Sequence, residues 1–142
     1  MNRRSKYIYE KTRDLNIERD NILWSNSNRN IIRDNINSYF IKKDNIYVGA
    51  FLIQKRYSSV YLTVFFYELC VFSDLINHLS DFIFRVFKDC EVIRIRITKD
   101  DIIGKTFLKL SNFKLELTRR KHYKLNGKYF DICYYSRYKY DV

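Results

Sequence analysis

The chain has 142 residues, 46% of them hydrophobic, and its 27 Lys and Arg residues against 16 Asp and Glu give a formal net charge of +11. This length and apolar content predict a single domain with one core and exclude a disordered tail. With no proline and three glycines, the composition also excludes collagen-like repeats and flexible linkers. The charge favours acidic partners such as nucleic acid, an anionic membrane or a phosphorylated ligand, although AT-rich codons alone would supply much of the Lys and Tyr.

The cysteines and histidines are widely spaced. Cys70, Cys90 and Cys133 form no Cys-x-x-Cys pair, and His78 and His122 lie far apart. This spacing predicts neither a metal site nor a disulfide framework, and it fits buried thiols in a reducing compartment. The first residues lead into no signal-peptide segment, and no apolar run approaches the ~20 residues of a membrane span. We therefore expect a cytoplasmic protein with no metal and no membrane association.

Residues 1–45 are the least patterned part of the chain. Residues 7–9 are expected to open a strand, and the spacing of Ile32, Ile36 and Tyr39 predicts one face of a helix. Three strand-like runs separated by turn residues follow, at residues 39–42, 46–54 and 60–67. Their short connections predict an antiparallel meander of three strands.

The clearest helix is expected over residues 73–88. Ser73 is a good N-cap, and Asp74 places a negative charge in the first turn, where it suits the helix dipole. Apolar residues then recur with helical period: Leu75, Ile76, Leu79, Phe82, Ile83, Val86 and Phe87. They form one broad stripe, which predicts an amphipathic helix.

The remaining third of the chain alternates between strand and helix patterns. Isoleucines at 93, 95 and 97 alternate with Arg94 and Arg96, which predicts a strand with one cationic face. A short helix is expected over residues 102–110, with Phe107 and Leu110 as core contacts. Two final strands, over 113–125 and 129–138, are joined by Asn126-Gly127, the strongest short hairpin signal.

The order of these elements predicts the fold class. A strand, a long helix and a second strand in succession imply a parallel pair of strands. The hairpins and the meander imply antiparallel neighbours for the other strands. We therefore expect an α+β fold in which one domain, residues 1–142, holds a mixed, mainly antiparallel sheet flanked by helices.

A family resemblance rests on the C-terminal residues. The run Leu108-Lys-Leu-Ser-Asn-Phe-Lys-Leu-Glu, continued by Arg120-Lys-His-Tyr and Asn126-Gly-Lys-Tyr-Phe-Asp131, resembles the end of GNAT-superfamily N-acyltransferases. It is closest to the branch that acetylates ribosomal proteins. Val48-Gly49-Ala50 is similar to the family's small-residue motif, and the element order agrees over residues 46–138. The resemblance implies a GNAT-like fold and transfer of an acyl group from acetyl-CoA, or another acyl thioester, to an amine.

The resemblance also implies where an acyl-CoA would bind. In the family, a glycine-rich loop before the long helix binds the pyrophosphate through backbone N–H groups. The corresponding residues 67–74 hold no glycine, arginine or lysine, and Glu68 and Asp74 add negative charge. We therefore expect a degenerate loop. The cofactor contacts that the resemblance implies are Thr63, Phe65, Ser73, Asp101 and Gly104. Without the glycine-rich loop, Arg94 and Arg96, or else Lys99 and Lys105, would have to supply the positive charge for an acyl-CoA. For the two arginines, the solvated face of a strand is the alternative.

Two residues are candidates for acid–base chemistry. Glu68, at the end of a central strand, is the best carboxylate for a general base, and a solvated strand end is the alternative. His122 lies among four cationic residues on a later strand, and an exposed surface histidine is the alternative there. The family's tyrosine acid would fall near Phe107 and Leu108, neither of which donates a proton. Cys70 is either a nucleophile or a buried thiol.

The C-terminal hairpin suggests a different function. Its cations, Arg119, Arg120, Lys121, Lys124, Lys128, Arg137 and Lys139, are interleaved with Tyr123, Tyr129, Tyr134, Tyr135, Tyr138 and Tyr140. Cations beside stacking aromatics suit single-stranded nucleic acid, although aromatics also simply make good strands or mark a protein interface. Three functions stay open: an N-acyltransferase, a non-catalytic GNAT-like domain that binds a protein partner, and a nucleic-acid-binding module. A homodimer is also open.

Overall fold

A computed structural model of the chain describes residues 7–13, 15–16, 22–26, 31–32, 37–68 and 72–140. Their strands and helices, in chain order, are β1 (Tyr7–Thr12), β2 (Leu15–Asn16), β3 (Trp24–Ser25), β4 (Ile31–Ile32), β5 (Ser38–Lys43), β6 (Ile46–Arg56), β7 (Ser59–Phe66), α1 (Phe72–Val86), β8 (Val92–Thr98), α2 (Ile102–Leu110), β9 (Lys114–Leu125) and β10 (Lys128–Tyr138).

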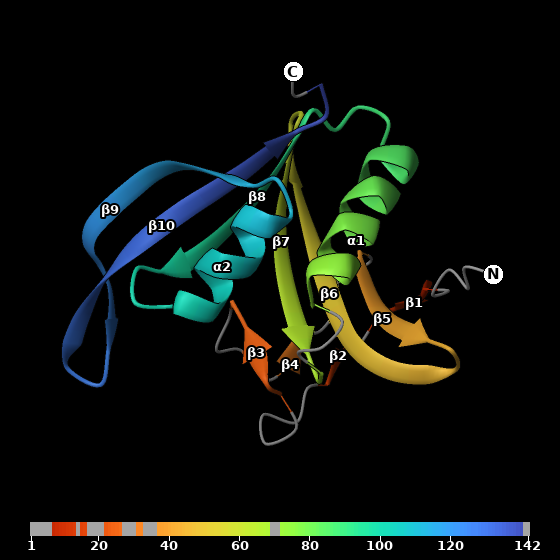
Figure 1. Cartoon of the computed structure of the whole chain (residues 1–142), viewed down its shortest axis with the longest axis horizontal. Coiled ribbons are helices and arrows are strands. Elements are labelled where there is room, and N and C mark those ends of the chain that lie inside the picture. Colours follow the sequence, from red (N-terminus) through yellow and green to blue (C-terminus); the bar gives the residue numbers. More distant parts are fainter. Residues whose placement is uncertain are drawn as a thin grey trace.

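One eight-stranded sheet organises these elements (Figure 1). Seven strands follow the order β1-β5-β6-β7-β8-β10-β9, and β3 pairs with β7 off this path. Strands β2 and β4 form a separate pair. The pairing of β7 with β8 is parallel, and the other pairings in this sheet are antiparallel. The predicted fold class, α+β with a mixed and mainly antiparallel sheet, is therefore confirmed.

The predicted helix that included Ile32 and Tyr39 is wrong. Ile32 lies in β4 and Tyr39 in β5, while Ile36 is outside the described residues. Tyr39 is opposite Phe51 of β6 in the ladder, and their rings stack with centroids 4.8 Å apart. Since β5 is paired on both sides, by β1 and by β6, sheet pairing overrides the short helical spacing.

Helix α1 follows most of its predicted apolar pattern, but it ends at Val86 instead of residue 88, and Val86 of the predicted stripe is 48% exposed. Leu75, Ile76, Leu79 and Ile83 of the apolar stripe are 0% exposed, and Asp74 lies in the first turn as predicted. The helix begins at Phe72, so Ser73 lies within the first turn, and its prediction as N-cap is wrong.

Helix α2 differs from its prediction in the residue that it buries. Leu108 is 0% exposed and Phe107 packs partly buried against the core, whereas Leu110 is 62% exposed. The prediction that Leu110 packs in the core is therefore wrong, and Leu108, two positions earlier, packs there instead. The hairpin turn between β9 and β10 is confirmed, because Asn126 and Gly127 have φ of 51° and +78°, as a type I′ turn requires.

The two faces of the sheet are covered differently. Both helices lie on one face (Figure 1), where residues such as Val64, Ile95 and Tyr135 pack against them in the main core. A smaller cluster, formed by Leu15, Ala50, Leu52 and Phe65, occupies the opposite face. Because side chains alternate along β8, Arg94 and Arg96 lie on that opposite face. In the described part of the chain, neither helix is long and apolar enough to cross a membrane.

Candidate functional site

Strands β7 and β8 part at their carboxyl ends. They are paired at Ser59–Val92, Val60–Ile93 and Tyr61–Arg94. Strand β7 then continues to Phe66 and β8 to Thr98 as they diverge (Figure 1). Helix α1 follows β7, and α2 follows β8. The carboxyl ends of parallel strands that separate in this way are where α/β sheets place their ligands, so this opening is the first candidate site.

The edge of β7 that faces the opening is already paired. Strand β3 lies antiparallel to it, with Trp24 opposite Phe66 and Ser25 opposite Phe65. Four hydrogen bonds join residues 23–26 to this edge: Leu23 N to Phe66 O at 2.9 Å, Ser25 Oγ to Val64 O at 2.6 Å, Asn26 Nδ2 to Leu62 O at 3.0 Å, and Val64 N to Asn26 Oδ1 at 2.8 Å. An N-terminal segment therefore occupies the place beside β7.

Trp24 anchors this segment in the core. Its side chain is 6% exposed and stacks on Phe66 with centroids 5.9 Å apart. Its indole Nε1–H donates to Oδ2 of Asp101 at 2.8 Å, and Oδ1 of Asp101 accepts from Gly104 N at 2.9 Å. A Cβ on Gly104 would lie 3.0 Å from Cζ2 of Trp24. Asp101 and Gly104, two of the predicted cofactor contacts, thus hold Trp24 in this structure.

The other predicted cofactor contacts are dispersed. Phe65 is 0% exposed in the cluster of the opposite face, and Thr63 is half-buried on the same strand. Arg94 donates to Oγ of Ser59 at 2.8 Å, and Arg96 is exposed. The side chain of Ser73 is not described, and residues 69–71 of the junction, including Cys70, lie outside the described residues.

The two predicted acid–base residues do not meet. Glu68 is exposed just beyond the carboxyl end of β7, at the mouth of the opening. His122 is exposed on β9, near the hairpin turn. Strands β8 and β10 lie between β7 and β9, which at about 4.8 Å per strand separates the two residues by at least about 14 Å, since β7 and β8 also diverge before Glu68. They cannot act on one atom as a dyad.

A polar cluster that the sequence does not predict lies on the face opposite the helices. Glu116 of β9 accepts hydrogen bonds from the hydroxyls of Tyr138 and Ser136, and its Oε2 lies 3.7 Å from Nε of Arg94. The Tyr138 hydrogen bond is the main cause that lowers the pKa of Glu116, and the same bond raises the pKa of Tyr138. Sequence spacing does not reveal this cluster, because its members come from three strands that meet through the sheet order.

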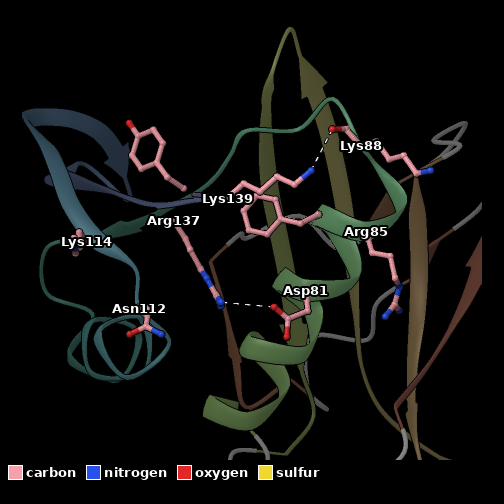
Figure 2. Close-up of a pocket in the computed structure, with 9 residues that line it drawn as sticks. Asp81, Arg85, Lys88, Asn112, Lys114, Arg137 and Lys139 are labelled. Atoms are coloured by element: carbon pink, nitrogen blue, oxygen red, sulfur yellow. Dashed lines mark hydrogen bonds and ion pairs between the residues drawn. The ribbon is translucent and has the colours of Figure 1, made fainter. Parts of the chain in front are cut away.

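A cationic groove lies between α1 and the end of β10 (Figure 2). Its volume is about 890 Å³, and among its lining side chains are the five cations Arg85, Lys88, Lys114, Arg137 and Lys139 and the single carboxylate of Asp81.

Contacts across the groove hold two of these cations (Figure 2). Arg137 contacts Asp81 at 3.7 Å, as Figure 2 shows, and it also donates to Oδ1 of Asn77 at 3.1 Å. Lys139 Nζ donates to the carbonyl oxygen of Lys88 at 3.4 Å. The groove is suited to an anionic surface and repels protonated amines.

Comparisons with known proteins agree on one family. The model of the acetyltransferase (GNAT) domain matches residues 29–134. No curated protein matches the chain. A GNAT-family acetyltransferase from Bacillus anthracis superposes with a TM-score of 0.65 at 14% identity, over 74% of this chain and 68% of that one.

Two further solved structures have named activities. RimL, a ribosomal L7/L12 alpha-N-protein acetyltransferase in complex with coenzyme A, superposes with a TM-score of 0.62 at 21% identity, over 71% of this chain and 60% of that one. The spermidine/spermine N-acetyltransferase SpeG from Vibrio cholerae superposes with a TM-score of 0.65 at 14% identity, over 72% and 66% of the two chains. The chain thus spans about three fifths to two thirds of these structures, and at these identities the likeness shows the fold.

Proposed function

We propose that this chain, which belongs to the GNAT acetyltransferase family, is an N-acyltransferase that moves an acyl group from an acyl thioester to an amine. The observation that carries the proposal is the parting of β7 and β8 beyond Tyr61 and Arg94, a ligand-binding position in a sheet of this kind. The CoA bound to RimL and the amine acceptors named for RimL and SpeG support the same class of reaction. Cys90 and Cys133 are free and buried. Free thiols persist in a reducing compartment, which supports the proposal that the protein is cytoplasmic.

The donor does not fit the opening in the described conformation. An extended ligand along β7 would use the backbone groups of Leu62, Val64 and Phe66, and these are bonded to residues 23–26. Asp101 and Gly104 hold Trp24 instead of facing an empty site. The described conformation is therefore closed to a donor at this edge.

The charge of the protein indicates which amine it accepts. Free amines are cations at neutral pH, and the groove beside α1 combines five cationic side chains with one carboxylate. A small polycation is therefore repelled from this surface. The groove lies beside Arg137 and Tyr138, which pair with Ile93 and Val92 at the amino end of β8, whereas the strands part toward their carboxyl ends. We propose that the acceptor amine belongs to an acidic protein or peptide that extends from the groove, which attracts its carboxylates, to the parted strands.

Glu68 is the residue that we propose as general base. It lies at the carboxyl end of β7, where the acceptor must enter if the reaction takes place between the parted strands. A carboxylate in reach of the amine would take the proton that the nucleophile loses. His122, two strands away, is proposed only for contact with the acceptor.

The test is a thiol-release assay with acetyl-CoA and a panel of amines. We expect an acidic peptide with a free amino terminus to be acetylated faster than spermidine. We expect Glu68→Gln to lower kcat by a factor of about 100 or more, the usual contribution of a general base. Asp44→Asn, an exposed carboxylate in the turn between β5 and β6 and away from the groove, is the matched control. Absence of thiol release with every amine would contradict the proposal.

A non-catalytic GNAT-like domain is the second candidate, and the occupied β7 edge is the observation that favours it. Such a domain would bind a protein partner, or a second copy through the exposed Leu115, Leu117 and Leu125 of β9. Calorimetry that finds no heat with acetyl-CoA on the folded protein would favour this alternative. Sedimentation over a range of concentrations would test the homodimer.

Nucleic-acid binding by the hairpin is the third candidate. The observation that favours it is that residues 118–129 carry five cationic side chains and no acidic one. Against it, three cations of the hairpin already lie over its aromatic rings, where bases would have to stack. The charged groups lie 5.4–5.5 Å from the ring centroids in the pairs Arg119–Tyr134, Lys124–Tyr129 and Lys128–Phe130. A labelled oligonucleotide whose affinity falls steeply with salt would support this function, and salt-independent or absent binding would exclude it.

A further inference from the structure

We propose that residues 23–26 compete with the acyl donor for the edge of β7, so that the donor binds only after this segment has left. The inference rests on the proposed function and adds a regulation of the same site. It is carried by the four hydrogen bonds of residues 23–26 to β7 together with the contact of Trp24 with Asp101.

The backbone groups of β7 point alternately to the two edges of the strand. Tyr67 N donates to Val48 O at 2.9 Å, so the backbone N–H and C=O groups of the odd-numbered residues at this end of the strand point toward β6. The backbone N–H and C=O groups of the even-numbered residues Leu62, Val64 and Phe66 point to the opposite edge, where β8 has diverged. Such an edge is a template for any extended segment that carries amide groups.

The segment on this edge bonds to β7 in the way that a peptide would. Two of its bonds come from one side chain, because the amide of Asn26 donates to Leu62 O and accepts from Val64 N. A side-chain amide has the same donor and acceptor as a peptide group. Asn26 thus makes the pair of bonds that an amide of an extended ligand would make, and the two cannot be present together.

The segment is held mainly by one side chain. Its paired part is a strand of two residues, and Leu23 beside it is 57% exposed. Trp24, buried and bonded to Asp101, is the main anchor. A short element with one anchor opens more readily than the central strands. The apparent affinity for the donor is then reduced by the fraction of molecules that are open.

Two variants weaken the segment, and only Asn26→Ala leaves the main core volume unchanged, because Trp24→Phe also shrinks a core side chain that is 6% exposed. Asn26→Ala deletes the two bonds of the part-buried amide, and Trp24→Phe keeps a ring while deleting the indole N–H. Thr106→Ala is the matched control, since the exposed Thr106 hydroxyl donates to Ile102 O within α2. Acetyl-CoA binding is measured by calorimetry, and amide hydrogen exchange of Leu23, which donates to Phe66 O, reports whether the segment has left.

We expect Asn26→Ala and Trp24→Phe each to bind acetyl-CoA about tenfold more tightly than the wild type, because more molecules are open. Thr106→Ala should bind as the wild type does. By reciprocity, acetyl-CoA should accelerate exchange of the Leu23 amide.

Three results would overturn the inference. Equal affinity of wild type and both variants would show that the segment does not compete, while acyl transfer would stand. Donor binding without faster exchange at Leu23 would place the donor elsewhere. The last result is that acetyl-CoA at about 1 mM binds neither the wild type nor the variants, although the variants are folded and exchange the Leu23 amide faster. This result would overturn both the inference and the proposed acyltransferase.

Discussion

The indole N–H of Trp24 donates to Oδ2 of Asp101 at 2.8 Å across 77 positions of sequence. Asp101 is also the N-cap of α2, because its Oδ1 accepts from Gly104 N. One carboxylate therefore fixes both the start of a helix and a strand from the N-terminal region. A change at either end of this contact should affect the stability of both elements.

Gly104→Ala should destabilise the protein, although alanine is favoured over glycine by about 1 kcal/mol within a helix. The added Cβ would lie 2.8 Å from Oδ2 of Asp101 and 3.0 Å from Cζ2 of Trp24. We expect a net loss of about 1–3 kcal/mol, as in other overpacked sites, measured by urea denaturation. In a Trp24→Phe background, which lacks Cζ2, the loss should be smaller. A variant as stable as the wild type would contradict this packing.

Acid should weaken the protein partly through Glu116. Hydrogen bonds from Tyr138 and Ser136 and the nearby Arg94 lower its pKa below the ordinary value of 4.5 in the folded state. A carboxylate with a lowered folded pKa adds stability above its unfolded pKa, and this stability is lost as the pH falls through the folded value. Glu116→Gln should therefore flatten the pH dependence of the unfolding free energy below about pH 4.5. An unchanged pH dependence in Glu116→Gln would contradict this contribution.

Most of the fold follows from local patterns in the sequence. The meander, α1, β8 and the final hairpin were each predicted, because an unbroken period or a turn signal marks each of them. Before Tyr39, the strand expected to open at residues 7–9 is confirmed as β1, but the other short strands were not predicted. Strands β3 and β4 have two residues each, which is too short for any period to be visible, and they are defined by pairing with distant segments.

The candidate site was predictable only in outline. Asp101 and Gly104 were singled out through the family resemblance, but their actual contact, Trp24, lies in the unpatterned region. Glu116 ends the run that carries the family resemblance, but its contacts were not predicted, since its partners Arg94 and Tyr138 are brought to it by the sheet order β8-β10-β9. Long-range pairing, which no local pattern encodes, decides both sites.

The turn between β9 and β10 depends on Gly127. Its φ is +78°, in the left-handed region, and nothing lies within 4 Å of an added Cβ. The effect of Gly127→Ala is therefore a backbone effect, and we expect a loss of about 1 kcal/mol in the unfolding free energy. Asn126→Gly, which also tolerates the positive φ of 51° at that position, should cost less. Equal losses for the two variants would contradict a type I′ turn.

The cationic groove should determine the preference for acidic acceptors. Lys88→Glu changes the local charge by two units at an exposed position of the groove, and its backbone carbonyl can still accept from Lys139. We expect KM for an acidic peptide to rise by about tenfold with little change in kcat, because the lost attraction acts on acceptor binding and not on the transfer step.

Added salt should raise KM of the wild type and reduce its difference from the variant, since screening weakens contacts between exposed charges. Lys11→Glu, exposed on the far edge strand β1, is the control with the same change in net charge. An equal rise in KM for both variants would mean that net charge attracts the acceptor. A rise confined to Lys88→Glu would locate the attraction in the groove.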